Sequence, residues 1–108
     1  MDSTYKYIED LATLIEVPAD GVLSRTVYAD DRVKAVIFGF DKDQELSEHT
    51  ASMPAIIQIV QGKAQITLGG ETHTAGTGAW ISMPANLSHS VHATTPVVML
   101  LVLLKSHN

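Results

Sequence analysis

Turn signals recur about every 8–12 residues from Gly21 onward, and they divide the chain into short strand-like segments. The segments between the turns are rich in Val, Ile and Thr, and no amphipathic helical pattern follows residue 20. Nine or ten such segments indicate an all-β sandwich or barrel. Parallel βα units are excluded because the helices that they need are missing.

The turn residues also predict how neighbouring segments are joined. The predicted strands cover residues 22–28, 33–40, 46–50, 55–61, 64–68, 71–75, 79–83, 88–93 and 97–104. Only Gly62 and Lys63 separate the fourth and fifth strands, which predicts a tight hairpin between them. Gly69 and Gly70 predict a two-residue turn with positive φ at both positions. We expect residues 1–20 to form an N-terminal arm and residues 21–105 to form the barrel.

Composition limits the function classes open to this single domain of 108 residues. A net charge of -5 argues against nucleic acid and anionic membranes as the main partners. The lack of cysteine excludes disulfides, thiolate metal sites and cysteine nucleophiles, so any metal would be one suited to His or carboxylate ligands: Zn, Mn, Fe, Ni or Cu. Without a visible signal peptide or a membrane-spanning run, we expect a soluble cytoplasmic protein.

Several apolar and aromatic residues predict packing against other parts of the protein or against a second copy. Val97–Leu104 is apolar on both faces, so we expect it to be covered on both sides, partly by the mate of a homodimer. We expect Trp80 to pack in the core or at a dimer interface rather than to serve as a substrate platform. Tyr5 and Tyr7 are expected to pack the arm onto a neighbouring surface.

Two motifs carry a family resemblance over residues 22–104. The spacing Gly78-x5-Pro84-x-Asn86-x2-His89 and the run from Gly39 through His49 to Gly62 resemble the two conserved motifs of the cupin family. Asn86 replaces the glycine of the second motif and tolerates the left-handed conformation. The resemblance implies a double-stranded β-helix, or jelly-roll barrel, and small members of the family are usually dimers.

The resemblance also implies a divalent metal held by a His-x-His pair, a glutamate and a final histidine. His49 matches the first of these positions and His89 the last. Ala51 and Ala55 stand at the two remaining positions, and alanine cannot coordinate a metal. Catalytic zinc sites generally use three protein ligands, so this chain holds either a reduced metal site or none.

Strand alternation predicts which other side chains line the barrel. His92 follows His89 at an odd offset, which places it on the opposite face of its strand. His73 shares its parity with Ala75 and is expected to line the barrel or close one end. The predicted ligand-binding set comprises His49, Met53, Ile57, Ile59, His73, Met83, His89 and Val91.

Three functions remain open on the sequence, and the loss of two ligand positions favours the first. The first is a binding or sensing module, or a structural dimer, in which an apolar pocket takes a small molecule. The second is a metal-dependent dioxygenase, isomerase or decarboxylase that uses His49 and His89. The third is metal-free acid–base catalysis by one histidine. No nucleophile constellation is visible, and whether the chain is an enzyme stays open.

Overall fold

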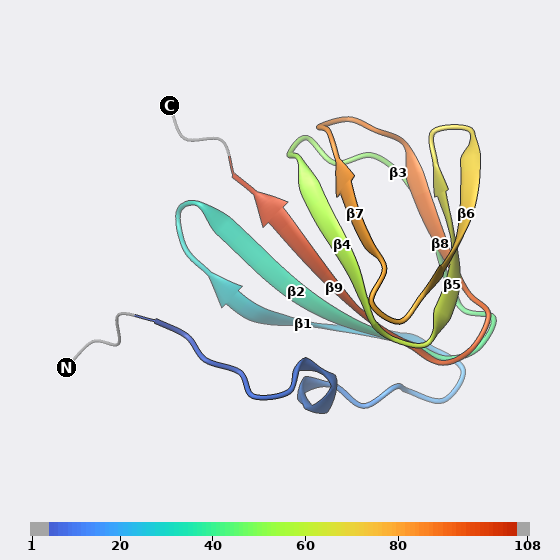
Figure 1. Cartoon of the computed structure of the whole chain (residues 1–108), viewed down its shortest axis with the longest axis horizontal. Coiled ribbons are helices and arrows are strands. Elements are labelled where there is room, and N and C mark those ends of the chain that lie inside the picture. Colours follow the sequence, from blue (N-terminus) through green and yellow to red (C-terminus); the bar gives the residue numbers. More distant parts are fainter. Residues whose placement is uncertain (1–4, 106–108) are drawn as a thin grey trace.

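Two antiparallel sheets form the body of the protein in the computed structural model, which describes residues 5–105 (Figure 1). The strands of the larger sheet follow the order β1-β2-β9-β4-β7, and those of the smaller sheet the order β3-β8-β5-β6. Their bounds are β1 Val22–Ala29, β2 Val33–Phe40, β3 Glu45–His49, β4 Ala55–Gln61, β5 Lys63–Leu68, β6 Glu71–Gly76, β7 Trp80–Met83, β8 His89–Ala93 and β9 Val97–Leu104. The predicted all-β jelly-roll fold is confirmed.

The core lies between the two sheets because each strand turns its alternate side chains inward. In β4, Ala55, Ile57 and Ile59 are buried, while the residues between them are only partly covered. In β8, Val91 and Ala93 are buried in the same way. Burying these branched side chains supplies most of the driving force for bringing the sheets together, at about 25 cal/mol per Å² of apolar surface.

The predicted hairpin between β4 and β5 is wrong, although the two strands are separated by a single residue. β4 pairs with β7 and β9 in the larger sheet, whereas β5 pairs with β6 and β8 in the smaller one. Gly62 has a φ of 99° and carries the chain from one sheet to the other. The sequence signal for a tight turn therefore marks a corner of the barrel.

The β5–β6 hairpin is confirmed, with Leu68 paired to Glu71 across a two-residue turn. Its backbone differs in part from the prediction. Gly69 has a positive φ of 61°, but Gly70 does not adopt the left-handed region. The prediction of positive φ at both positions is wrong at Gly70.

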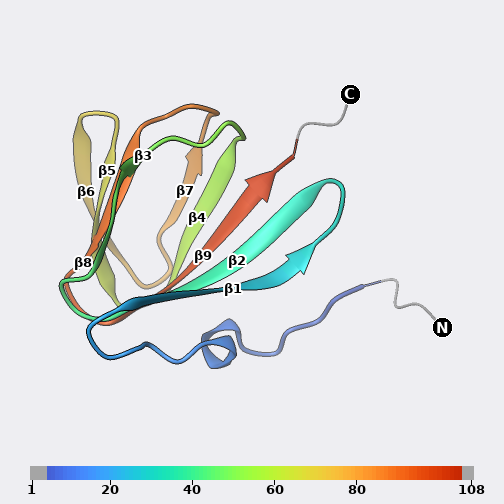
Figure 2. The ribbon, with the colours of Figure 1, turned by 180° about the vertical axis from the view of Figure 1, so that it is seen from behind.

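The N-terminal arm covers part of the outer face of the larger sheet (Figure 2). Its single helical turn, η1 Leu11–Leu14, is a 3-10 helix capped by Asp10, whose side chain accepts a hydrogen bond from the amide of Ala12. Ile15 then packs against Ile37 and Val98 in a second apolar cluster. The arm therefore covers one end of the outer face of β9, which lies inside the sheet between β2 and β4.

Three aromatic residues expected to pack against other surfaces are exposed. Trp80 is 61% exposed, so its assignment to the core is wrong, and its place at a dimer interface stays a prediction. Tyr5 and Tyr7 are 78% and 74% exposed, so neither is buried against the described chain, and their packing against a second copy stays a prediction. Residues 1–4 of the predicted arm lie outside the described residues. Between residues 5 and 105, no helix is long and apolar enough to cross a membrane.

Candidate functional site

Three chain segments meet at one end of the barrel, the upper end in Figure 1. The amide of Asn86 donates a hydrogen bond of 2.7 Å to the carbonyl of Ala51, which joins the β7–β8 turn to the β3–β4 loop. The amide of Gly69 donates one of 2.7 Å to the carbonyl of Ser88, which adds the β5–β6 turn. Asn86 has a φ of 68°, which confirms its predicted left-handed conformation.

His49 and His89 come together at this end. His49 closes β3, His89 opens β8, and the two are partners in the register of these strands. Their ring centroids lie 4.2 Å apart with the ring planes tilted by 56°. His89 is 6% exposed, whereas His49 lies on the edge strand of its sheet and is exposed. The sequence motifs thus bring two imidazoles into contact, one buried and one open to solvent.

The hydrogen bonds of these rings fix which nitrogen carries a proton. Nδ1 of His49 lies 2.8 Å from the carbonyl oxygen of Ser47, and Nδ1 of His89 lies 2.9 Å from that of Leu87. A carbonyl oxygen can only accept, so both Nδ1 atoms donate. In the neutral rings Nε2 therefore keeps its lone pair. Within residues 5–105, no group forms a hydrogen bond with either Nε2.

Apolar residues flank the buried member of the histidine pair, His89. Leu68 of β5 is the register partner of His89 on the side away from His49. Met83, the last residue of β7, is 3% exposed and belongs to the main core cluster. Met53 lies in the β3–β4 loop and is half-buried. The pair is thus set at the edge of an apolar core.

The other members of the predicted ligand-binding set do not lie beside the histidine pair at this end of the barrel. Ile57, Ile59 and Val91 are at most 1% exposed and belong to the packed core cluster. They would contact a ligand only if the core opened. His73 shares the inner face with its register partner Ile66, but its side chain is 50% exposed and its Nε2 lies 3.4 Å from Glu71.

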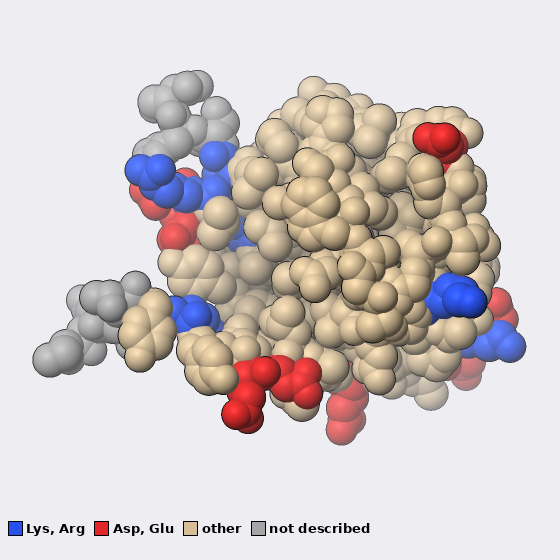
Figure 3. Space-filling model, in the orientation of Figure 1, with Lys and Arg blue, Asp and Glu red and all other residues tan. Residues whose placement is uncertain are grey.

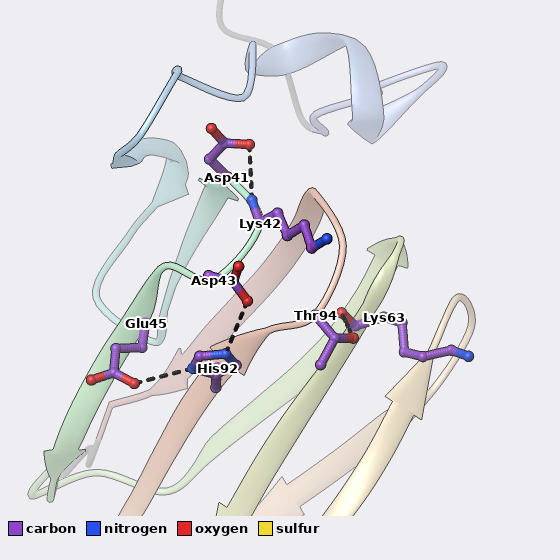
Figure 4. A network of polar contacts seen from close by, with 7 residues as sticks. All are labelled: Asp41, Lys42, Asp43, Glu45, Lys63, His92 and Thr94. Carbon is purple, nitrogen blue, oxygen red and sulfur yellow. Dashed lines mark hydrogen bonds and ion pairs between the residues drawn. The ribbon is translucent and has the colours of Figure 1, made fainter.

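His92 faces away from the core, as the alternation of β8 predicts (Figure 4). Its Nδ1 lies 3.2 Å from a carboxylate oxygen of Glu45, and its Nε2 lies 3.6 Å from one of Asp43. These residues tie β8 to β3 on the outer face of the smaller sheet. Because all three side chains are exposed, the contacts are screened by solvent and contribute little stability.

The titratable groups with shifted pKa values belong to two turns outside the histidine pair. The Tyr28 hydroxyl donates a hydrogen bond of 2.6 Å to Asp30, and the amides of Arg32 and Val33 donate two more. These hydrogen bonds lower the pKa of Asp30 to about 2. The amides of Asp20 and Lys42 lower the pKa of Asp41 through hydrogen bonds to its carboxylate.

Sequence reasoning missed a cleft of about 460 Å³ between the N-terminal arm and β1. Its lining comprises Lys6–Asp10, Thr13, Leu14 and Arg25–Val27. Arg25 helps to form the cleft, because its guanidinium donates a hydrogen bond of 2.9 Å to the carbonyl of Leu14. Local periodicity gives no signal for this feature, since it depends on where the arm docks. It contains neither histidine of the pair.

The family model of the cupin domain matches residues 36–103, which is more than half of the chain. The chain belongs to the cupin family. This match includes both histidines and the alanines between them. A comparison with curated proteins returned no match.

Solved cupin-like structures resemble the chain over most of its length. A conserved protein of unknown function from Streptococcus pyogenes is 32% identical, with a TM-score of 0.86, over 96% of this chain and 91% of that one. A cupin superfamily protein from Desulfitobacterium hafniense is 26% identical, with a TM-score of 0.86, over 94% of both chains. A cupin 2 conserved barrel domain protein from Leptotrichia buccalis is 26% identical, with a TM-score of 0.81, over 87% of this chain and 46% of that one.

The residues present do not fit the divalent metal site that the cupin resemblance implies. Two of the four ligand positions hold alanine, and Ala55 is buried with no donor atom in its side chain. In the part of the chain that the structure describes, no group of three or more His, Cys, Asp or Glu residues is placed to hold a metal ion. The pair alone supplies fewer protein ligands than catalytic zinc sites generally use.

Proposed function

We propose that this cupin is a binding module for a small molecule and that His49 and His89 are its polar contact groups. The observation that carries the proposal is the orientation of the two rings. In both rings Nδ1 donates a hydrogen bond to a backbone carbonyl oxygen, and Nε2 has no hydrogen-bond partner among residues 5–105. A few oriented polar groups within an apolar surround are typical of small-molecule sites.

The chemistry of the pair indicates the kind of ligand. A neutral imidazole with a proton on Nδ1 accepts a hydrogen bond at Nε2, so the matching ligand carries a donor such as a hydroxyl or an amide N–H. Met53 and Leu87 are half-buried beside the histidine segments and supply apolar contact area. The proposed ligand is therefore a small apolar molecule that presents a hydrogen-bond donor.

A ligand screen followed by NMR tests this function. We would record ring and backbone spectra of the metal-free protein with a set of small apolar alcohols and amides. Ligands of the proposed class shift the ring signals of His49 and His89, and His49→Ala and His89→Ala each weaken binding by at least about tenfold. His92→Ala is the control, because this ring lies on the outer face. Hits that bind both variants unchanged, or that map to the cleft beneath the arm, contradict the proposal.

We further propose that the module is a homodimer whose interface includes the outer face of β4 and β7. Trp80 is a large apolar residue on this face that is 61% exposed, and it is the register partner of Gln58. Ile56 lies two residues earlier in β4 and is only partly buried. Charged side chains lie around the margins of the face in Figure 3 and not over these strands. β7 is an edge strand of the larger sheet. Edge strands that face solvent usually carry charged side chains, so the lack of charge here favours an interface.

A further inference from the structure

The cleft between the N-terminal arm and β1 contains neither histidine of the pair and has no part in the proposed function. The arm runs beside β1 in Figures 1 and 2, and it is tied to this strand by the hydrogen bond from Arg25 to the carbonyl of Leu14. Among residues 5–105, no hydrogen bond joins residues 6–9 to β1. The space between them is about 460 Å³, within the range of roughly 300–1,000 Å³ found for small-molecule sites.

A β-bulge contributes to the lining of this cleft. The register of β1 and β2 shifts between Thr26 and Tyr28, so Val27 has no partner in β2. Val27 and Leu14 line the cleft and pack against the second apolar cluster, and Ile8 is partly buried beside them. We call these three residues the apolar wall. Bulges re-aim side chains and often lie next to active sites, so the bulge marks this part of β1 as a candidate binding surface.

The same cleft carries charges of both signs that do not pair with each other. Its positive side chains are Lys6 and Arg25, and its negative ones are Glu9 and Asp10. Within the described residues, no ion pair joins any of these four side chains. A guanidinium has five N–H donors, and the hydrogen bond to Leu14 uses one of those of Arg25. Such a lining is complementary to a ligand that itself carries both charges.

We propose that this cleft is a second binding site, which takes a small zwitterion with an apolar side chain, the class of the apolar amino acids and their dipeptides. The Arg25 guanidinium binds the carboxylate of the ligand, because its planar fork matches two carboxylate oxygens. Glu9 accepts hydrogen bonds from the ammonium group, since the carboxylate of Asp10 already accepts the amide of Ala12 as a helix cap. The apolar wall contacts the side chain of the ligand.

Calorimetric titration with leucine and two of its derivatives tests each charge of the ligand separately. Leucinamide lacks the carboxylate and N-acetyl-leucine lacks the ammonium group, so each should bind at least about tenfold more weakly than leucine. Leucyl-leucine is titrated in parallel, and the tighter of the two zwitterions distinguishes a dipeptide from a free amino acid as the ligand. Backbone NMR should place the shifts at residues 6–10 and 25–27 and leave the signals of His49 and His89 unchanged.

Matched variants pair each charge of the protein with one charge of the ligand. Arg25→Gln should weaken leucine binding at least about tenfold and leave leucinamide binding unchanged, because leucinamide has no carboxylate to lose. Glu9→Gln should weaken leucine binding and leave that of N-acetyl-leucine unchanged, because this derivative has no ammonium group. Glu16→Gln is the control, since Glu16 is an exposed acidic residue of the arm outside the lining of the cleft.

Three results overturn the inference: no response to leucine or leucyl-leucine at millimolar concentration, NMR shifts at the histidine pair instead of the cleft, or derivatives that bind as tightly as leucine. Arg25 also holds the arm through Leu14. An equal loss for all three ligands in Arg25→Gln would therefore show that the substitution releases the arm, and it would overturn the assignment of Arg25 to the carboxylate. Glu9 forms no hydrogen bond within the described residues, so Glu9→Gln still decides whether the cleft binds the ammonium group.

Discussion

Gly62 lies so close to the carbonyl oxygen of Pro96 that a Cβ atom at this position would overlap it. Its φ of 99° also lies in the region that favours glycine. We expect Gly62→Ala to lower the free energy of unfolding by about 2–4 kcal/mol, because the backbone must shift at the corner where the chain changes sheets. Denaturant unfolding measures the loss, and the melting temperature falls by roughly 10 °C.

Gly70→Ala is the matched control for this corner. No atom lies within 4 Å of a Cβ built on Gly70, and its φ lies outside the left-handed region. The variant should change the free energy of unfolding by no more than about 0.5 kcal/mol. If Gly62→Ala proves as harmless as Gly70→Ala, the close approach to Pro96 does not constrain the corner.

Gly62 also illustrates how far the sequence predicts the fold. Strand alternation and turn residues were sufficient for nearly every strand, because they are local properties of the chain. The partner of each strand is a non-local property. The short Gly62-Lys63 link therefore predicted a hairpin, whereas the structure places the two strands in opposite sheets. The residue that leaves no room for a Cβ at Gly62 is Pro96, which lies 34 positions further along the chain. Local sequence patterns do not show such a contact.

The turn between β1 and β2 gives a prediction about pH. The hydrogen bond from Tyr28 is the largest cause of the low pKa of Asp30, and the amides of Arg32 and Val33 add to it. We expect Tyr28→Phe to raise the pKa of Asp30 from about 2 toward its ordinary value of 3.8, because the main donor to the carboxylate is removed. A carboxyl ¹³C NMR titration measures this change, with Tyr7→Phe as the control because Tyr7 is exposed.

The direction of the stability change follows from the same shift. Since the folded-state pKa of Asp30 is lower than its unfolded value, ionised Asp30 stabilises the fold above about pH 4. That contribution is lost as the pH falls from about 4 through about 2. Tyr28→Phe should therefore lose less stability over this acid range than the wild type. An equal loss in both proteins would show that the Tyr28–Asp30 hydrogen bond does not form in solution.

The ring tautomers of His49, His89 and His73 provide a test of the candidate site without any ligand. Above neutral pH, we expect His49 and His89 to carry the proton on Nδ1, since each Nδ1 faces a carbonyl oxygen. His73 should carry it on Nε2, since that nitrogen faces Glu71. Long-range ¹H–¹⁵N NMR spectra of the rings distinguish the two tautomers. Protons on the Nε2 atoms of His49 and His89 would contradict the proposed acceptor role.

The sequence singled out the two histidines of the candidate site but did not predict how their rings are oriented. Motif spacing singled out His49 and His89, and it showed that Ala51 and Ala55 cannot act as ligands. The hydrogen bonds to Ser47 and Leu87 depend on local irregularities, including the register shift between Leu46 and His49. Side-chain parity alone does not predict such shifts. The same limit applies to His73, whose parity is right but whose position on the outermost strand leaves it exposed.

The exposed Trp80 provides the last prediction, which concerns the homodimer. We expect the wild type to be a dimer at micromolar concentration and Trp80→Glu to be a monomer, because a buried carboxylate without a partner would be costly at the interface. Light scattering coupled to gel filtration measures both masses. Leu23→Glu is the matched control, since Leu23 is an exposed apolar residue on β1, at the opposite edge of the same sheet. The folded Trp80→Glu monomer should unfold as cooperatively as Leu23→Glu, since neither residue contributes to the core. A monomeric wild type, or a Trp80→Glu variant that remains dimeric, contradicts an interface over β4 and β7.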